Sequence, residues 1–314
     1  MDPVNKVHHS PAITNVSYSD WLGVTWQKDA EQTVEKLTSL KPNWLIVDHY
    51  ALDSNWHKEV RPLVDRIMVI DDLANRSHDC AMLLDQNLGR VLSDYEGLSS
   101  PNCTKLIGPV FALLRPEFPA SRQRSLLRRR SAGLSRILVS LGGADQANVT
   151  SQVLRVLAMS SLPDATELDI VMGASAPSLK EVCDLAARLP FKATVSTDVA
   201  DMAERMCQAD LSIGAAGGTS WERCCLGLPV VLVTLAENQL SGARALEAAG
   251  AAVSVGWPEA LSKELPLAIA KVKEPEALQR MSRAAAGVTE GDGVSKVFAA
   301  MMEISRGTGC LSIN

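Results

Sequence analysis

The feature that most constrains this chain is the alternation of short apolar runs with longer segments of helical periodicity. Segments such as 32–40, 150–158 and 178–188 carry apolar residues at helical spacing. The apolar runs between such segments are short and end in polar residues or glycine. The runs that we expect to be buried strands cover residues 44–47, 67–70, 137–140, 168–172, 211–213 and 230–234. Strand–helix alternation of this kind predicts an α/β chain with parallel sheets.

Composition and length agree with this fold class. Hydrophobic residues make up 46% of the chain but aromatic residues only 4%. The core must therefore consist largely of Ala, Val, Leu and Ile, which suits parallel sheets between helices. The 314 residues fit two domains of ordinary size. An arginine-rich run and a Ser-Ala-Gly stretch interrupt the strands between Arg115 and Arg136, so we predict one domain with linker over 1–130 and a second, including the C-terminal helices, over 131–314.

Charge and hydropathy argue against several classes of protein. The net charge of −5 and the isoelectric point near 5.6 lack the basic excess of nucleic-acid binders. One local basic run consists of Arg122, Arg124, Arg128, Arg129 and Arg130. We expect this run on a solvated linker helix rather than at a polyanion site. No secretion signal and no apolar run of bilayer-spanning length is visible, so we expect a cytoplasmic protein that binds neither nucleic acid nor membrane.

We expect neither a disulfide framework nor a metal. The seven cysteines include no C-x-x-C pair and no matching histidine spacing, which favours free thiols in a reducing compartment. Asp71 and Asp72 follow an apolar run and suggest a pair of metal ligands. Adjacent strand residues point to opposite faces, however, so we predict no metal site there. We also predict no cofactor.

The first of two glycine-containing turns covers residues 140–145. Gly142 and Gly143 follow a predicted strand and precede a predicted helix. Glycine allows a sharp turn and close approach of a ligand, and the free N–H groups at a helix start favour an anion. An ordinary tight turn between a strand and a helix explains the same residues equally well, so phosphate binding stays open for this segment alone.

The second turn, over residues 213–222, is a stronger indication. Its small and hydroxyl-bearing residues allow a diphosphate to lie against the backbone. They are Gly217, Gly218, Thr219 and Ser220. Glu222 either has only an electrostatic capping role or accepts hydrogen bonds from a ribose diol. Two such turns in one domain favour a nucleotide-binding site.

Two further polar segments end predicted strands. Residues 237–239 (Glu-Asn-Gln) lie where ligands bind in open α/β sheets, although a helix cap by Asn238 is the better explanation on spacing alone. Residues 48–50 (Asp-His-Tyr), followed by Asp53, can all move protons. A capping or core-facing role explains any single one of them equally well.

Six segments taken together resemble a known family. They are residues 48–50, 70–74, 84–88, 113–118, 140–145 and 214–222, in this order. The series closely resembles the UDP-2,4-diacetamido-2,4,6-trideoxy-β-L-altropyranose hydrolases of pseudaminic acid biosynthesis, over roughly residues 21–256. The resemblance implies a GT-B fold, related to the lipid II N-acetylglucosaminyltransferase. In that fold two Rossmann-like parallel-sheet lobes form a sugar-side lobe within 1–130 and a UDP-binding lobe within 131–314.

The resemblance also implies a reaction and its residues. Water would attack the anomeric carbon without a metal, inverting it and releasing UDP and the free amino sugar. Tyr50 and Asn238 would lie near the sugar as catalytic residues. The residues that would bind UDP are Gly142, Gly143, Asp145, Gly217, Gly218, Thr219, Ser220 and Glu222, the last at the ribose.

The sequence departs from the family near its start. The family opens with a strand and a Gly-x-Gly-His-x-x-Arg turn whose histidine acts as general base, and His8 and His9 lack this motif. Phe111 also replaces a family tyrosine. We therefore expect an incomplete first lobe, reduced stability and weak or absent hydrolysis. A UDP-sugar-dependent glycosyltransferase and a non-catalytic UDP-sugar-binding protein stay open as alternatives.

Overall fold

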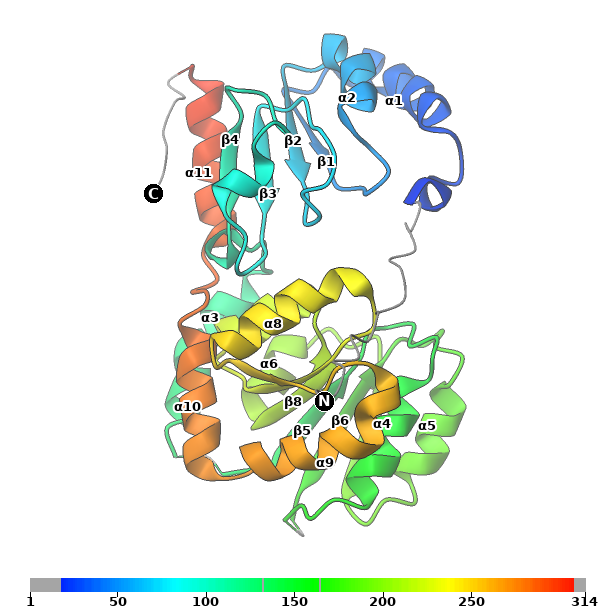
Figure 1. Ribbon diagram of the computed structural model, residues 1–314, viewed down its shortest axis with the longest axis vertical. Coiled ribbons are helices and arrows are strands. Elements are labelled where there is room, and N and C mark those ends of the chain that lie inside the picture. Colours follow the sequence, from blue (N-terminus) through cyan, green and yellow to red (C-terminus); the bar gives the residue numbers. More distant parts are fainter. Residues whose placement is uncertain (1–17, 132, 164, 308–314) are drawn as a thin grey trace, which may run out of the picture.

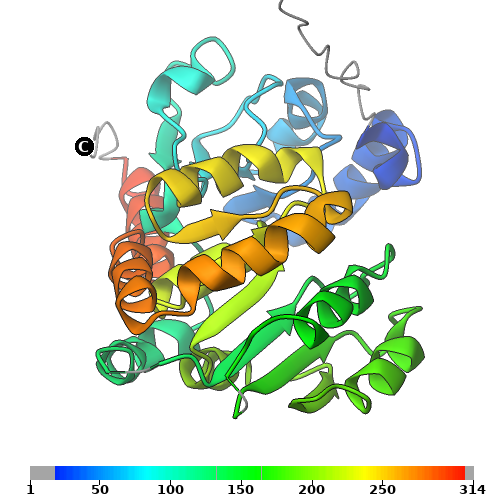
Figure 2. The same ribbon diagram turned by 60° about the horizontal axis from the view of Figure 1, so that its bottom comes forward.

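The computed structural model describes residues 18–131, 133–163 and 165–307, and His8 and His9 lie outside these ranges. Two parallel sheets form two lobes in this part of the chain (Figures 1 and 2). The prediction of an α/β chain with parallel sheets is therefore confirmed. None of the described helices has both the length and the apolar character needed to cross a membrane.

The first lobe contains a four-stranded parallel sheet in the order β1-β2-β3-β4. Its strands are β1 (Trp44–Val47), β2 (Arg66–Ile70), β3 (Met82–Asp85) and β4 (Thr104–Ile107). The helices on one face are α1 (Trp26–Leu40) and α2 (Ser54–Val60). Short 3-10 turns lie at η1 (Tyr18–Leu22), η2 (Arg61–Leu63), η3 (Leu92–Tyr95) and η4 (Pro109–Phe111). The prediction that this lobe is incomplete stays a prediction.

Alternation along β2 shows why both faces of this sheet are covered. Ile67 and Val69 pack with the core of α1 and α2, whereas Met68 packs on the opposite face. On that second face, Val297 and Ala300 of α11 (Gly293–Ser305) complete the core. The inner strands of the sheet are thus buried on both sides, as in most parallel sheets, whereas Ile46 of the edge strand β1 is 54% exposed.

Helix α11 follows the second lobe in sequence but packs on the first. In Figure 1 the red α11 lies beside the cyan strands of the first sheet. The start of the helix is close to the loop after β4, since a Cβ on Gly293 would lie 2.3 Å from the Ala112 carbonyl oxygen. The structure therefore differs from the expected 131–314 domain for this helix. Periodicity shows that a helix has an apolar face but not which sheet receives it. The boundary between residues 130 and 131 stays a prediction.

The second lobe contains a six-stranded parallel sheet in the order β10-β9-β8-β5-β6-β7. Its strands are β5 (Arg136–Ser140), β6 (Glu167–Met172), β7 (Lys192–Thr197), β8 (Leu211–Ala215), β9 (Val230–Val233) and β10 (Ala252–Ser254). One face packs against α4 (Val149–Ala158), α5 (Leu179–Ala186) and α9 (Leu261–Val272). The other packs against α3 (Glu117–Arg128), α6 (Met202–Gln208), α7 (Thr219–Cys225) and α8 (Leu240–Ala248). The remaining elements are η5 (Glu237–Gln239), η6 (Pro258–Ala260) and α10 (Pro275–Ala286).

The strand order of this sheet reverses next to β5. The chain builds β6 and β7 on one side of β5 and then β8, β9 and β10 on the other. The carboxyl ends of β5 and β8 therefore flank the crevice in which open α/β sheets bind ligands. Both glycine turns identified in the sequence follow these two strands.

The arginine-rich run extends along α3, but two of its residues contradict the expected solvated face. Arg122 donates to the carbonyl oxygens of Cys225 at 2.6 Å and Ala286 at 2.7 Å. Arg129 is buried and donates to the carbonyl of Ala209 at 2.6 Å. These carbonyls lie at the ends of α7, α10 and α6, where helices lack internal partners. Arg122 and Arg129 therefore attach α3 to the second lobe, so the predicted helix is present but its arginine run is not wholly solvated.

Candidate functional site

A cavity of about 290 Å³ lies where the carboxyl ends of the two sheets face each other. The first lobe contributes residues at or just after the carboxyl ends of β1, β2 and β3: Asp48, Tyr50, Ile70, Asp71, Asp72, Gln86 and Asn87. The second lobe contributes the residues that follow β8 and β9: Ala216, Gly217, Gly218, Ser220, Trp221, Asn238, Gln239, Gly242 and Leu246. Residues separated by nearly 200 positions in sequence therefore line one cavity.

Tyr50 and Asp72 form a hydrogen-bonded pair on the first-lobe side. The Tyr50 hydroxyl donates to Asp72 Oδ2 at 2.8 Å. Burial, and then this hydrogen bond, raise the pKa of Tyr50, so its hydroxyl keeps its proton at neutral pH. Burial also raises the pKa of Asp72, against the effect of the Tyr50 hydrogen bond. A hydrogen bond from Asn238 of the second lobe has the opposite effect on Tyr50 and lowers its pKa. Tyr50 thus interacts with both lobes.

Aromatic contacts fix the ring of Tyr50. Its ring centroid lies 4.8 Å from that of Tyr18 and 5.7 Å from that of Trp21. Both neighbours belong to η1, and both rings are tilted against Tyr50. Such contacts restrict the position of the hydroxyl group at the cavity.

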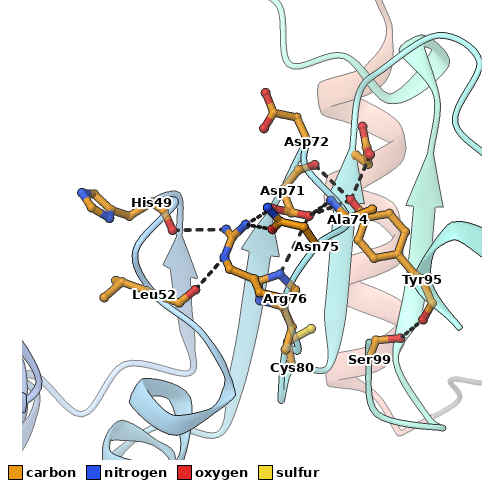
Figure 3. A network of polar contacts seen from close by, with 12 residues as sticks. His49, Leu52, Asp71, Asp72, Ala74, Asn75, Arg76, Cys80, Tyr95 and Ser99 are labelled. Atoms are coloured by element: carbon orange, nitrogen blue, oxygen red, sulfur yellow. Dashed lines mark hydrogen bonds and ion pairs between the residues drawn. The ribbon is translucent and has the colours of Figure 1, made fainter. Parts of the chain in front are cut away.

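A buried ionic network lies behind this pair (Figure 3). Asp71 is 1% exposed, pairs with Arg76 at 2.6 Å, and accepts hydrogen bonds from the Ala74 N–H and the Tyr95 hydroxyl. Burial by itself would raise the pKa of Asp71, but His78 and Arg76 hold that pKa well below its ordinary value. Asp71 is therefore a charged structural centre, and its neighbour Asp72 faces Tyr50 instead.

Arg76 connects this network to the loop that carries Tyr50. Its guanidinium donates to the carbonyl oxygens of His49 at 3.3 Å and Leu52 at 3.1 Å (Figure 3). These two residues flank Tyr50 in sequence. Because Asp71 anchors Arg76 from the adjacent strand, the network holds the loop around Tyr50 in place.

No three His, Cys, Asp or Glu side chains of the described ranges converge into a group that suits a metal ion. Asp71 and Asp72 have different partners, as alternation along a strand predicts.

The second glycine turn forms the opposite wall of the cavity. Gly217 and Gly218 line it, and nothing lies within 4 Å of the place where either would carry a Cβ. The backbone there faces open space that a ligand can enter. Ser220 also lines the cavity, whereas Thr219 does not. The structure thus brings three of the four small residues of this turn to the same cavity as Tyr50 and Asn238.

Glu222 lies on α7, one residue beyond the cavity-lining Trp221. Its carboxylate is partly buried and has no hydrogen-bond or ion-pair partner among the residues that the structure describes. Burial raises its pKa, and the positive charge of Arg115 opposes this. The carboxylate is therefore free to accept hydrogen bonds from a ligand, and its role at a ribose stays a prediction.

The first glycine turn does not line the cavity. Asp145 is buried, and its carboxylate accepts hydrogen bonds from the N–H groups of Val149 at 2.8 Å and Thr150 at 2.9 Å. This carboxylate therefore occupies the anion position that we expected at the start of α4. Gly142 has a φ of +99°, which favours glycine whether or not a ligand is present. UDP binding by Gly142, Gly143 and Asp145 stays a prediction, and the contacts of Asp145 are those of a helix cap.

Two alternatives left open by the sequence now have an answer. Asn238 is not a helix cap, because Ala236 occupies the cap position of η5 and Asn238 lines the cavity. Asp53 is a cap, since its Oδ1 accepts a hydrogen bond from the Asn55 N–H at 2.8 Å at the start of α2. Asp48 lines the cavity.

Several cavity residues were not predicted as site residues. They include Asp72, Gln86, Asn87 and Trp221. The motif at residues 84–88 contains two of them, but a motif alone does not show which side chains reach a ligand. Gln86, for example, also accepts a hydrogen bond from the Leu113 N–H at 2.7 Å.

The chain is similar to several proteins of known name. The chain is 29% identical over 139 residues to a UDP-2,4-diacetamido-2,4,6-trideoxy-β-L-altropyranose hydrolase of Campylobacter jejuni, covering 44% of this chain and 47% of that protein. It is 31% identical over 182 residues to a UDP-N-acetylglucosamine–N-acetylmuramyl-(pentapeptide) pyrophosphoryl-undecaprenol N-acetylglucosamine transferase of Sorangium cellulosum, covering 55% and 45%. The chain spans about half the length of the curated relatives that it matches.

Solved structures confirm the predicted GT-B-like fold. The crystal structure of Acinetobacter baumannii MurG superposes with a TM-score of 0.63 at 16% identity, covering 88% of this chain and 78% of that one. Residues 137–297 match the model of the glycosyltransferase family 28 C-terminal domain. This range begins in β5 and includes the glycine turn and Asn238. The chain therefore belongs to the glycosyltransferase family 28 C-terminal domain family.

Proposed function

We propose that this chain hydrolyses UDP-2,4-diacetamido-2,4,6-trideoxy-β-L-altropyranose to UDP and the free sugar. The observation that carries this proposal is the cavity in which Tyr50 of the first lobe faces Asn238 and the glycine turn of the second. The Campylobacter relative, whose name states this reaction, supports the choice of substrate. The six ordered motifs of the sequence support it as well.

The second-lobe wall would bind the nucleotide. Open backbone at Gly217 and Gly218 leaves room for a diphosphate, and Ser220 adds a hydroxyl at the cavity surface. Glu222 has no partner among the described residues and would accept hydrogen bonds from the ribose. Hydrogen bonds to a charged acceptor contribute about 1.5–3 kcal/mol each.

The first-lobe wall would carry the chemistry. Water would attack the anomeric carbon, the bond from that carbon to the β-phosphate oxygen would break, and UDP would leave with the electron pair. The Tyr50 hydroxyl keeps its proton and would orient the sugar or the water. Asp72 Oδ1 is buried without a hydrogen-bond partner in the described residues, so this oxygen would accept the proton that water loses.

A glycosyltransferase is the second candidate. The observation in its favour is the 31% identity to the Sorangium transferase, which is comparable to the identity with the hydrolase. Both reactions would use the same nucleotide side of the cavity. They differ in whether water or an acceptor hydroxyl attacks the anomeric carbon.

The test is release of UDP from the UDP-diacetamido-trideoxy-altrose by the purified chain, followed by a coupled assay, with calorimetric binding of UDP in parallel. Release that needs no acceptor is the expected result. Release only after addition of an acceptor alcohol or lipid-linked sugar would favour the transferase. Binding of UDP without release would leave a UDP-sugar-binding protein, and absence of UDP binding would overturn the proposal.

A further inference from the structure

A buried cation lies directly beneath the glycine turn. Arg223 of α7 is 1% exposed, and among the described residues no carboxylate lies within ion-pair distance of its guanidinium. Its Nη2 donates to the Ala215 carbonyl at 2.6 Å and to Ser220 Oγ at 3.1 Å, and its Nε has no partner. Burial lowers its pKa to about 10, so it remains charged at neutral pH. A buried charge of this kind is costly unless something balances it.

Arg129, another buried arginine of this lobe, has its positive charge balanced by more hydrogen-bond acceptors. Arg129 donates to three backbone carbonyls, those of Met206, Ala209 and Leu226. All lie near helix ends, where carbonyls carry partial negative charge. Arg223 has a single carbonyl and one hydroxyl. Its contacts therefore leave more positive charge unbalanced than those of Arg129.

The backbone makes room for this guanidinium. A Cβ on Gly214 would lie 2.4 Å from Arg223 Nη1 and 2.8 Å from the Ser140 carbonyl oxygen. Gly214 lies one residue before the end of β8 and pairs with Ser140 of β5, at the crevice where the strand order reverses. A residue with a side chain at this position would displace the cation from the strand that leads into the turn.

The hydrogen bond to Ser220 links the buried Arg223 guanidinium to the cavity. Ser220 Oγ accepts from Arg223, and its own O–H has no acceptor among the residues described. Ser220 lines the cavity. A hydroxyl that accepts from a cation on one side has its proton available on the other, where an anionic ligand would take it.

We propose that Arg223 is a positioning residue for the diphosphate of a nucleotide bound in this cavity. It acts through Ser220, whose hydroxyl it orients, and through the Ala215 carbonyl, which it holds at the start of the turn. Its positive charge balances the negative charge of the diphosphate without direct contact. The inference rests on nucleotide binding as proposed above, and assigns the diphosphate rather than the base or sugar as the group that Arg223 serves.

The test compares Arg223→Met, which keeps length but removes charge, with Arg223→Lys, which keeps charge. Calorimetry measures binding of UDP, and saturation-transfer NMR measures binding of uridine. Arg223→Met should weaken UDP binding by about 10- to 100-fold and leave uridine binding unchanged, since one or two hydrogen bonds to a charged ligand are affected. Arg223→Lys should recover most of the UDP affinity. Equal losses for UDP and uridine, or no loss for UDP, would overturn the inference.

Ser220→Ala covers the case in which Arg223→Met does not fold. It removes the hydroxyl but leaves the cation buried, and should weaken UDP binding by about 3- to 10-fold with uridine unaffected. Unchanged UDP binding would contradict the proposed route through Ser220. ADP and GDP separate this inference from the proposed function. If the wild-type chain binds these but not UDP, and the binding depends on Arg223, the inference stands while the proposed substrate fails. If it binds no nucleoside diphosphate, both fail.

Discussion

The two walls of the cavity differ in what they present to a ligand: bonded side chains on the first-lobe side and open backbone on the second-lobe side. The first-lobe wall consists of charged and aromatic side chains tied together by buried hydrogen bonds, with Asp71 and Arg76 at their centre. The second-lobe wall is backbone without side chains at Gly217 and Gly218, with one buried cation behind it. Both walls stand at the carboxyl edge of a parallel sheet.

Under the proposed function, this difference would divide binding from chemistry. An open backbone accepts a bulky anion with little reorganisation. A reacting group instead needs its position and protonation state fixed before the substrate arrives. The Tyr50–Asp72 pair meets that requirement because the Asp71–Arg76 network holds the loop that carries Tyr50. We therefore expect substitutions in the first wall to affect stability and turnover, and those in the second to affect affinity.

The largest expected effect is on the network of the first wall. Asp71→Asn keeps the shape of the side chain but leaves the largely buried Arg76 guanidinium without its ionic partner, so the free energy of unfolding should fall by about 3–5 kcal/mol. Urea unfolding measures this. The control is Asp65→Asn, the same change at an exposed position, which should cost no more than about 0.5 kcal/mol. Similar losses for both variants would mean that the network does not hold this wall together.

The second expected effect is a pH dependence confined to the first lobe. Burial, and then the charge of His78, lower the pKa of His57 from 6.5 to about 4. Between these pH values the unfolded chain binds a proton at His57 that the folded chain does not. The contribution of His57 to the free energy of unfolding should therefore fall by about 3 kcal/mol as the pH drops from 6.5 to 4, while the raised pKa values of Asp72 and Asp85 act in the opposite direction.

His57→Asn tests this dependence. The Asp79 N–H donates to His57 Nδ1 at 3.2 Å, and an asparagine oxygen can replace that acceptor. Unfolding of this variant should depend less steeply on pH between 6.5 and 4 than that of the wild type. An unchanged slope would assign the acid sensitivity to other groups.

The third effect separates turnover from binding. Tyr50→Phe removes the hydroxyl that bonds Asp72 but keeps the ring among Tyr18 and Trp21, so hydrolysis should slow by about 100-fold. Calorimetric affinity for UDP should not change, because UDP is assigned to the opposite wall. A parallel loss of UDP affinity would break the proposed division between the two walls.

The smallest expected effect is a loss of UDP affinity, without a loss of stability, from a substitution in the second wall. Gly217→Ala adds a Cβ that meets no neighbour within 4 Å and occupies space at the turn, so UDP affinity should fall by about tenfold while thermal stability stays close to that of the wild type. Gly133→Ala is the matched control, since a Cβ on Gly133 also has nothing within 4 Å but lies outside the cavity. Loss of UDP affinity in both variants would point to a general effect of the added side chain.

Local sequence pattern determined the elements and the fold class. Each of the six runs expected as strands overlaps one of the observed strands, because a fully buried parallel strand is apolar along its whole length. The pattern missed four strands, β3, β4, β7 and β10. β3 is buried at all four of its residues but is a short run, and β4 has the sequence Thr-Lys-Leu-Ile with a single buried residue. β7 has the partly exposed sequence Lys-Ala-Thr-Val-Ser-Thr at the sheet edge, and β10 is only three residues long. The glycine turn at 214–218 was visible because small residues in a row after a strand have few other uses.

Only the tertiary structure decided which of the candidate groups share a site. The turns at Gly142 and Gly217 look alike in sequence, yet only the second lines the cavity, while Asp145 closes the first by capping α4. The structure also shows that Asp72 accepts a hydrogen bond from Tyr50 and that α11 packs on the first lobe. The reason is physical: periodicity and turn chemistry act over a few residues, whereas these contacts join strands and helices far apart in the chain. Their pairing depends on sheet order and packing, which no local pattern encodes.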